Sequence, residues 1–210
     1  MEPTKWPMRL LRPTRKCKNS LRRFGLDVIK SPGNEKVQMN PPLRVLLDTN
    51  AYDIYTRKYG LDRLTNAIGK KWIMLYGFKI VRDELRAIPK SIKEENKSFR
   101  NLILTTYDTL VKDHFYQTND IIENLAQQYF EAYRGSHSKI ELWNDFLIVA
   151  CASIHNLTVL VTEDQRTMQS MHALAAYMII NQKNDFNMPQ FYSTDRFEQL
   201  LKSVMSDTLI

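Results

Sequence analysis

Two apolar runs in this chain have the length of a buried strand, and each is followed by acidic residues. The first is Val45-Leu46-Leu47, which stops at Asp48. The second is 157–161, rich in β-branched residues, which leads through Thr162 to Asp164. Such runs are typical of strands buried on both faces of a parallel sheet, where ligands bind beyond the carboxyl ends of the strands. The pattern therefore predicts that Asp48 and Asp164 share one edge of a sheet. For Asp48 alone, capping of a following helix is the alternative interpretation.

Most other apolar positions follow helical spacing. We expect a second strand within 72–81, mainly in its later part, and a helix that begins near Glu84 and ends before Pro89. Further helices are expected over 52–59, 61–68, 99–110, 120–133, 140–155, 170–180 and 194–204, with short extended pieces near 114–118 and 188–192. This alternation predicts an α/β fold with a short, mainly parallel sheet and helices on both faces.

Asp145 lies within the most apolar of the expected helices. Ser138 and Glu141 have the spacing of a capping box that opens this helix, and Asp120 and Glu123 have the same spacing one helix earlier. Asp145 shares a helix face with apolar residues three, four and seven positions away. A buried carboxylate requires compensation, either by a Lys or Arg partner or by a metal ion. The sequence leaves both possibilities open.

Composition adds a strong charge asymmetry. The 210 residues, 43% of them hydrophobic, suffice for one core, and the formal net charge is +7. Residues 1–42 hold ten Lys or Arg and three acidic residues, which leaves 20 basic and 20 acidic side chains in the other 168 residues. We expect a poorly ordered extension over 1–42, whose charge suits the phosphate backbone of RNA, and one folded domain over 43–210. The basic residues expected to contact RNA are Arg9, Arg12, Arg15, Lys16, Lys18, Arg22 and Arg23. A solvated tail without a specific partner, an organelle transit peptide, and translation from Met39 are the alternatives.

The sequence also disfavours several classes of protein. The two cysteines, Cys17 and Cys151, predict neither a disulfide framework nor a zinc site. No apolar stretch approaches the roughly 20 residues that span a bilayer, and no signal-peptide pattern opens the chain. We therefore expect a cytoplasmic protein with no membrane partner. The six glycines form no dinucleotide or phosphate-cradling motif, and the four histidines have no paired metal-ligand spacing.

Four acids are expected at one edge of the sheet: Asp48, Glu84, Asp145 and Asp164. Carboxylates gathered in one crevice repel one another, so that a hard divalent cation such as Mg²⁺ or Mn²⁺ would stabilise them. One or two such ions can activate water and stabilise both the attacking and the leaving oxygen of a phosphodiester displacement.

These residues resemble the motifs of the PIN-domain ribonucleases, most closely the VapC-type toxins of prokaryotic toxin–antitoxin pairs. The resemblance covers roughly residues 43–205. Its four motifs, in order, are Leu46-Leu47-Asp48-Thr49-Asn50, 81–85 with Glu84, 145–152 with Asp145, and 161–164 with Asp164. Each motif is short, but their order and spacing agree with the family.

The resemblance implies a PIN-like sandwich and metal-dependent endonucleolytic cleavage of RNA, with Mg²⁺ or Mn²⁺ held by the four acids. Thr49 or Asn50 would support the first carboxylate or the scissile phosphate, and Thr162 and Arg166 would also position substrate. The implied partners are RNA, an antitoxin protein and a second copy of the chain in a homodimer. The alternatives are an RNA-processing nuclease of ribosome or tRNA maturation, and a non-catalytic RNA-binding or assembly module.

Overall fold

The computed structural model describes residues 41–94 and 96–206, and the expectations for the basic extension lie outside this range except at its last two residues. Its main sheet has the strand order β5-β2-β1-β6-β7, and every neighbouring pair is parallel. The strands are β1 Leu43–Leu47, β2 Ile73–Phe78, β5 Phe115–Tyr116, β6 Val159–Val161 and β7 Gln190–Tyr192. A separate antiparallel pair is formed by β3 Lys93–Glu94 and β4 Lys97–Ser98. The expected mainly parallel sheet is confirmed.

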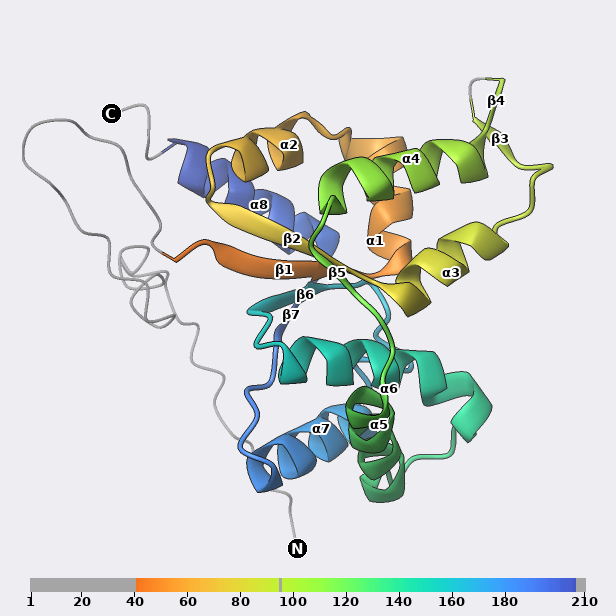
Figure 1. Cartoon of the computed structure of the whole chain (residues 1–210), viewed down its shortest axis with the longest axis vertical. Coiled ribbons are helices and arrows are strands. Elements are labelled where there is room, and N and C mark those ends of the chain that lie inside the picture. The colour runs from red at the N-terminus through yellow and green to blue at the C-terminus, as the bar shows by residue number, and fades with distance from the viewer. Residues whose placement is uncertain (1–40, 95, 207–210) are drawn as a thin grey trace, which may run out of the picture.

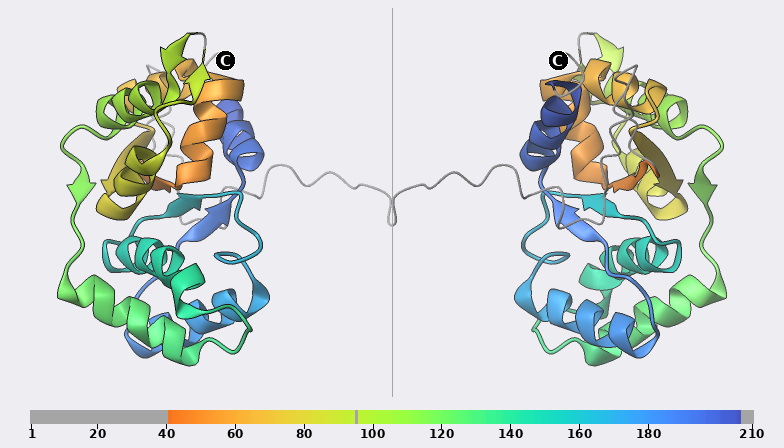
Figure 2. Two further views of the ribbon diagram at one scale, coloured as in Figure 1. Left: turned by 90° about the vertical axis from the view of Figure 1, so that its right-hand side faces the viewer. Right: turned by 90° about the vertical axis from the view of Figure 1, so that its left-hand side faces the viewer.

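Helices cover both faces of this sheet, as the α/β pattern predicts. They are α1 Thr49–Ile54, the π-helix η2 Tyr55–Tyr59, α2 Asp62–Gly69, α3 Lys79–Ala87, α4 Phe99–Val111, α5 Asp120–Ala132, α6 Lys139–Ile154, α7 Met171–Lys183 and α8 Thr194–Ser206. Helices α1, α2, α4 and α8 lie on one side of the sheet, and α5, α6 and α7 lie on the other (Figure 1). The two side views in Figure 2 show the same division into layers.

The central strand β1 brings the first two sequence signals together. Leu46 pairs with Leu160 and Leu47 with Val161, so that β1 and β6 run side by side and end together. Val45, Leu46 and Leu47 are buried, as expected for a strand covered on both faces. Asp48 and the segment that follows Val161 therefore leave the sheet at the same edge.

The second strand and the helix after it differ from the sequence expectation. β2 occupies the earlier part of 72–81, and Glu84 is the sixth residue of α3 rather than its start. The apolar run extends beyond β2 into the first turn of α3, where Val81 is buried. Phe78 makes no side-chain capping hydrogen bond, so the sequence gives no signal for the boundary between strand and helix. Glu84 consequently projects from the second turn of α3.

Helix caps account for several boundaries. Ser138 and Glu141 form the expected capping box of α6, with both reciprocal hydrogen bonds present. The cap of α5 is Asn119, whose side chain accepts from the Ile122 amide, and not the expected pair of Asp120 and Glu123. Within the described ranges, none of these helices combines the length and the hydropathy needed to cross a bilayer.

Gly77 allows α4 to pack closely against β2. A Cβ placed at Gly77 would lie 2.3 Å from the Tyr107 hydroxyl and 2.7 Å from Val111 Cγ1. The Tyr107 hydroxyl is itself held by the backbone carbonyl of Phe78, at 3.1 Å, so it cannot move without losing a buried hydrogen bond. The close contact of strand and helix therefore depends on the missing side chain.

We predict that Gly77→Ala lowers the free energy of unfolding by about 1–3 kcal/mol through overpacking. Gly69→Ala is the matched control, because Gly69 lies in α2 with no atom within 4 Å of the added Cβ. That change should leave stability unchanged or raise it by about 0.5–1 kcal/mol through helix propensity. Urea unfolding of both variants measures the difference, and equal stabilities would contradict the packing account.

Candidate active site

Asp48 is the most enclosed acid of the site. It follows β1, caps α1 and is 6% exposed. Its Oδ1 accepts from the Thr49 amide at 2.7 Å, and its Oδ2 accepts from the Thr162 hydroxyl at 2.7 Å. Burial raises the pKa of Asp48 to about 6, against the lowering effect of these two hydrogen bonds, and the charges of Glu84 and Asp164 raise it further. Asp48 thus caps α1 and also belongs to the predicted acid site.

Asn50 links the ends of β1 and β6. Its side-chain nitrogen donates to Asp48 Oδ2 at 2.9 Å and to Thr162 Oγ1 at 3.3 Å, and its side-chain oxygen accepts from the Glu163 amide at 3.0 Å. Both ends of the amide are therefore engaged by the protein. Of the two roles expected for Asn50, the structure favours support of the first carboxylate over contact with a phosphate.

Glu84 is held between three helices. The Thr49 hydroxyl of α1 donates to Glu84 Oε2 at 2.5 Å, and the Asn144 side chain of α6 donates to Glu84 Oε1 at 2.7 Å. Thr49 was expected near the site, whereas Asn144 was not. Asn144 is an exposed helical residue without a motif of its own, so that no signal in the sequence identified it.

Asp145 is half-buried on α6, and its Oδ2 is enclosed without a hydrogen-bond partner in the described part of the chain. None of the ion pairs formed within 41–94 and 96–206 involves Asp145. Burial raises the pKa of Asp145 to about 7, the Thr167 hydroxyl lowers it in part, and the charges of Asp164, Asp48 and Glu84 raise it. Mutual electrostatic effects therefore connect all four predicted acids.

Asp164 is fixed by the loop that follows it. Its Oδ1 accepts from the amides of Arg166 at 2.9 Å and Thr167 at 2.8 Å, and its Oδ2 accepts from the Thr167 hydroxyl. Burial by itself raises the pKa of Asp164, but these hydrogen bonds to Thr167 and Arg166 hold it below the ordinary value. Thr167 contacts both Asp164 and Asp145, and no sequence motif indicated it. The Arg166 side chain is exposed.

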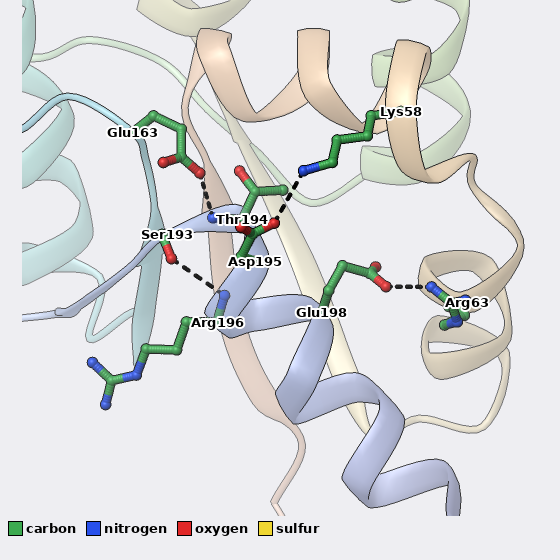
Figure 3. A network of polar contacts seen from close by, with 8 residues as sticks. All are labelled: Lys58, Arg63, Glu163, Ser193, Thr194, Asp195, Arg196 and Glu198. Carbon is green, nitrogen blue, oxygen red and sulfur yellow. Dashed lines mark hydrogen bonds and ion pairs between the residues drawn. The ribbon is translucent and has the colours of Figure 1, made fainter.

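The two acids adjacent to predicted site residues have other partners. Asp83 forms an ion pair with Lys79 one turn earlier in α3. Glu163 accepts from the Thr194 amide at 2.6 Å, so that its carboxylate lies at the N-terminus of α8 (Figure 3). Their side chains thus stabilise helices, as expected for neighbours that point away from the four acids.

The residue types suit a hard divalent cation, although the four carboxylates do not form a closed metal cage. Within the described ranges, no three His, Cys, Asp or Glu side chains lie close enough together to hold one ion. The unpartnered Asp145 oxygen and the raised pKa values of Asp48 and Asp145 nevertheless mark a place where added positive charge would be stabilising. Binding an ion would require side-chain rotations that bring these carboxylates closer together.

No protein-family model and no curated protein matches this sequence. Among solved structures, the chain is similar to VapBC2 from Rickettsia felis bound to a DNA fragment from its promoter, at 15% identity and a TM-score of 0.44 over 71% of this chain and 97% of the other. It is also similar to FitAcB from Neisseria gonorrhoeae, at 16% identity and a TM-score of 0.46 over 71% and 97%. A third similar structure is FitAB bound to an IR36 DNA fragment, at 17% identity and a TM-score of 0.45 over 71% of this chain and 94% of the other. All three similarities are at low sequence identity.

We predict that the metal-free protein becomes less stable as pH rises from about 4 to about 7. Burial raises the pKa values of Asp48 and Asp145, so the folded state binds their protons more tightly than the unfolded chain, and that stability is lost as both ionise. The lowered pKa of Asp164 has the opposite effect, but only in more acidic solution. Asp145→Asn should make the profile flatter and should melt no lower than wild type at pH 8 in EDTA. Thermal unfolding across this pH range tests both statements, and a large loss of stability in the variant would instead indicate a buried basic partner.

Proposed function

We propose that this chain is a Mg²⁺- or Mn²⁺-dependent endoribonuclease. The proposal depends chiefly on one observation: Asp48 after β1, Glu84 on α3, Asp145 on α6 and Asp164 after β6 gather at one edge of the sheet, where Thr49 hydrogen-bonds to the first two and Thr167 to the last two. A purely structural role would leave unexplained why Asp145 keeps an enclosed oxygen without a partner beside three further acids. The PIN resemblance of the same four positions agrees with this chemistry.

The chain itself would position the ion and the substrate. When bound, the ion would lower the pKa of a water molecule and stabilise negative charge on the phosphodiester. Asp48 would offer a carboxylate already oriented by Asn50 and Thr162, and Asp164 one already oriented by Thr167. Asp145 would turn its free oxygen toward the ion. Glu84, held at both oxygens, would bind the ion or accept a proton from the attacking water.

The biological setting is proposed from the resemblance. A VapC-like role would add an antitoxin partner and a homodimer, whereas an RNA-processing role would require neither. An antitoxin gene adjacent to the gene for this chain would favour the first role. The incomplete metal cage favours a second candidate, a PIN domain that binds RNA without cleaving it. Mg²⁺- or Mn²⁺-dependent cleavage of total RNA by wild type, but not by Asp48→Asn, would decide between enzyme and binding module.

We predict that the four acids and their sequence neighbours differ sharply in their effect on cleavage. Glu84→Gln and Asp164→Asn should lower the rate by at least about 100-fold, since the loss of about 3 kcal/mol of transition-state stabilisation corresponds to that factor. Asp83→Asn and Glu163→Gln are matched controls and should keep most activity. The Asp83 ion pair is exposed, and glutamine at 163 can still accept from the Thr194 amide. Cleavage rates at saturating metal would contradict this assignment if both sets lost activity equally.

We predict that removal of residues 1–40 weakens RNA binding and reduces its dependence on salt. This segment carries the whole formal net charge of +7, and each lost phosphate contact lowers the slope of log K against log [salt] by about 0.7 for single-stranded RNA. Titrations of a labelled RNA at several salt concentrations measure both quantities. Unchanged affinity and slope would exclude the extension from RNA binding.

A further inference from the structure

A hollow of about 410 Å³ lies where the loop between α5 and α6 meets the start of α7. Its lining is Tyr133, Arg134, Gly135, Ser136, His137, Ser170 and His172. None of these residues belongs to the acid site, and none was singled out for a function. Every polar side chain in the lining can donate a hydrogen bond, and no carboxylate lines the hollow.

Gly135 and Tyr133 shape this hollow. A Cβ at Gly135 would lie 2.1 Å from the Tyr133 hydroxyl, so that the ring can lie against the loop only because residue 135 has no side chain. The buried Tyr133 ring also contacts His172, with centroids 6.1 Å apart and planes nearly perpendicular. Packing of the Tyr133 ring against Gly135 and His172 therefore defines one wall of the hollow.

The Tyr133 ring also contacts α6, the helix that carries Asp145. Tyr133 packs against Phe146, with centroids 6.0 Å apart, and Phe146 follows Asp145 on α6. The capping residue of α6, Ser138, precedes Asp145 by seven residues, or about 10 Å along the helix. A polymer bound at the acids would thus pass close to the hollow.

The donors in the hollow suit an anion. One Arg134 nitrogen, Nη1, donates to the carbonyls of Glu131 and Tyr133 at 2.7 and 3.2 Å, which fixes the exposed guanidinium at the end of α5. Its other nitrogens have no hydrogen-bond partner within the described ranges. The imidazoles of His137 and His172 add two further donors, and the N-terminus of α7 adds a favourable dipole. The Glu141 carboxylate lies 3.6 Å from His137 Nδ1 but outside the lining.

We propose that this hollow binds a phosphate group of the RNA substrate that flanks the cleaved bond, with Arg134 as its main ligand and His137 and His172 as supporting donors. The inference rests on the proposed endoribonuclease function. An acidic segment of a protein partner would use similar donors. RNA is favoured because the hollow lies at the N-terminal end of α6, about two helical turns from Asp145, so that a strand with its cleaved bond at the acids can also reach the hollow.

The first test measures RNA binding by the full chain in EDTA, using the fluorescence anisotropy of a labelled single-stranded RNA. Arg134→Ala should weaken binding about 5–10-fold at low salt and lower the salt slope by about 0.7, while Arg134→Lys should retain the slope. Arg100→Ala is the matched control, because Arg100 also donates to a backbone carbonyl, that of Arg86, in a solvent-exposed hydrogen bond. In cleavage assays with metal, Arg134→Ala should raise KM and leave kcat nearly unchanged. Wild-type behaviour of Arg134→Ala in a protein that binds and cleaves RNA would overturn the hollow's role and leave the proposed function intact.

The second test uses inorganic phosphate and the imidazole NMR signals of His137 and His172. Phosphate should shift both signals in wild type and in Arg100→Ala, but much less in Arg134→Ala. Shifts without any effect of Arg134→Ala on RNA binding would identify a site for free phosphate and would overturn the RNA assignment. Displacement of phosphate by polyglutamate but not by RNA would overturn it in favour of a protein partner. A wild type that neither binds nor cleaves RNA would refute the proposed function and, with it, the assignment of the hollow to RNA.

Discussion

The enclosed Asp48 carboxylate is the constraint on which much of the site depends. A charge this deeply buried requires several donors, and they come from the Thr49 amide, Asn50 and Thr162. Two of these donors lie at the start of α1, and the third directly follows β6. Hydrogen bonds to one carboxylate therefore connect the ends of β1 and β6. Asn50 extends the connection to the Glu163 amide, and the Glu163 carboxylate in turn reaches the N-terminus of α8 (Figure 3). One buried charge thus connects the centre of the sheet to the last helix.

The four acids differ in how firmly the protein holds them. Asp48, Glu84 and Asp164 accept hydrogen bonds at both carboxylate oxygens, whereas Oδ2 of Asp145 has none in the described part of the chain. Because like charges in a poorly solvated place raise one another's pKa, the site carries repulsion that protonation or a cation would relieve. Hydrogen bonding limits the movement of three acids, and Asp145 has the greatest freedom to adjust to a ligand.

The sequence predicted those parts of the structure that have a local cause. The apolar runs before Asp48 and Asp164 became parallel strands, and the capping box at Ser138 started α6 where expected. The start of α3 was misplaced because one continuous apolar run served both a strand and the first turn of a helix, with no capping side chain between them. Asn144 and Thr167 could not be identified, since their contacts with the acids arise only when separate segments meet.

Helix α6 explains how the acids and the hollow can act on one ligand. Its N-terminal cap lies next to the loop that lines the hollow, and its second turn carries Asn144 and Asp145 into the acid site. The helix packs against α5, and Tyr133 at the end of α5 contacts both the hollow and Phe146. A single rigid helix therefore fixes the separation between a cationic hollow and an acidic centre. In the proposed function, an ion held by the acids would bind one phosphate of an RNA strand, and the donors of the hollow would bind another phosphate of the same strand.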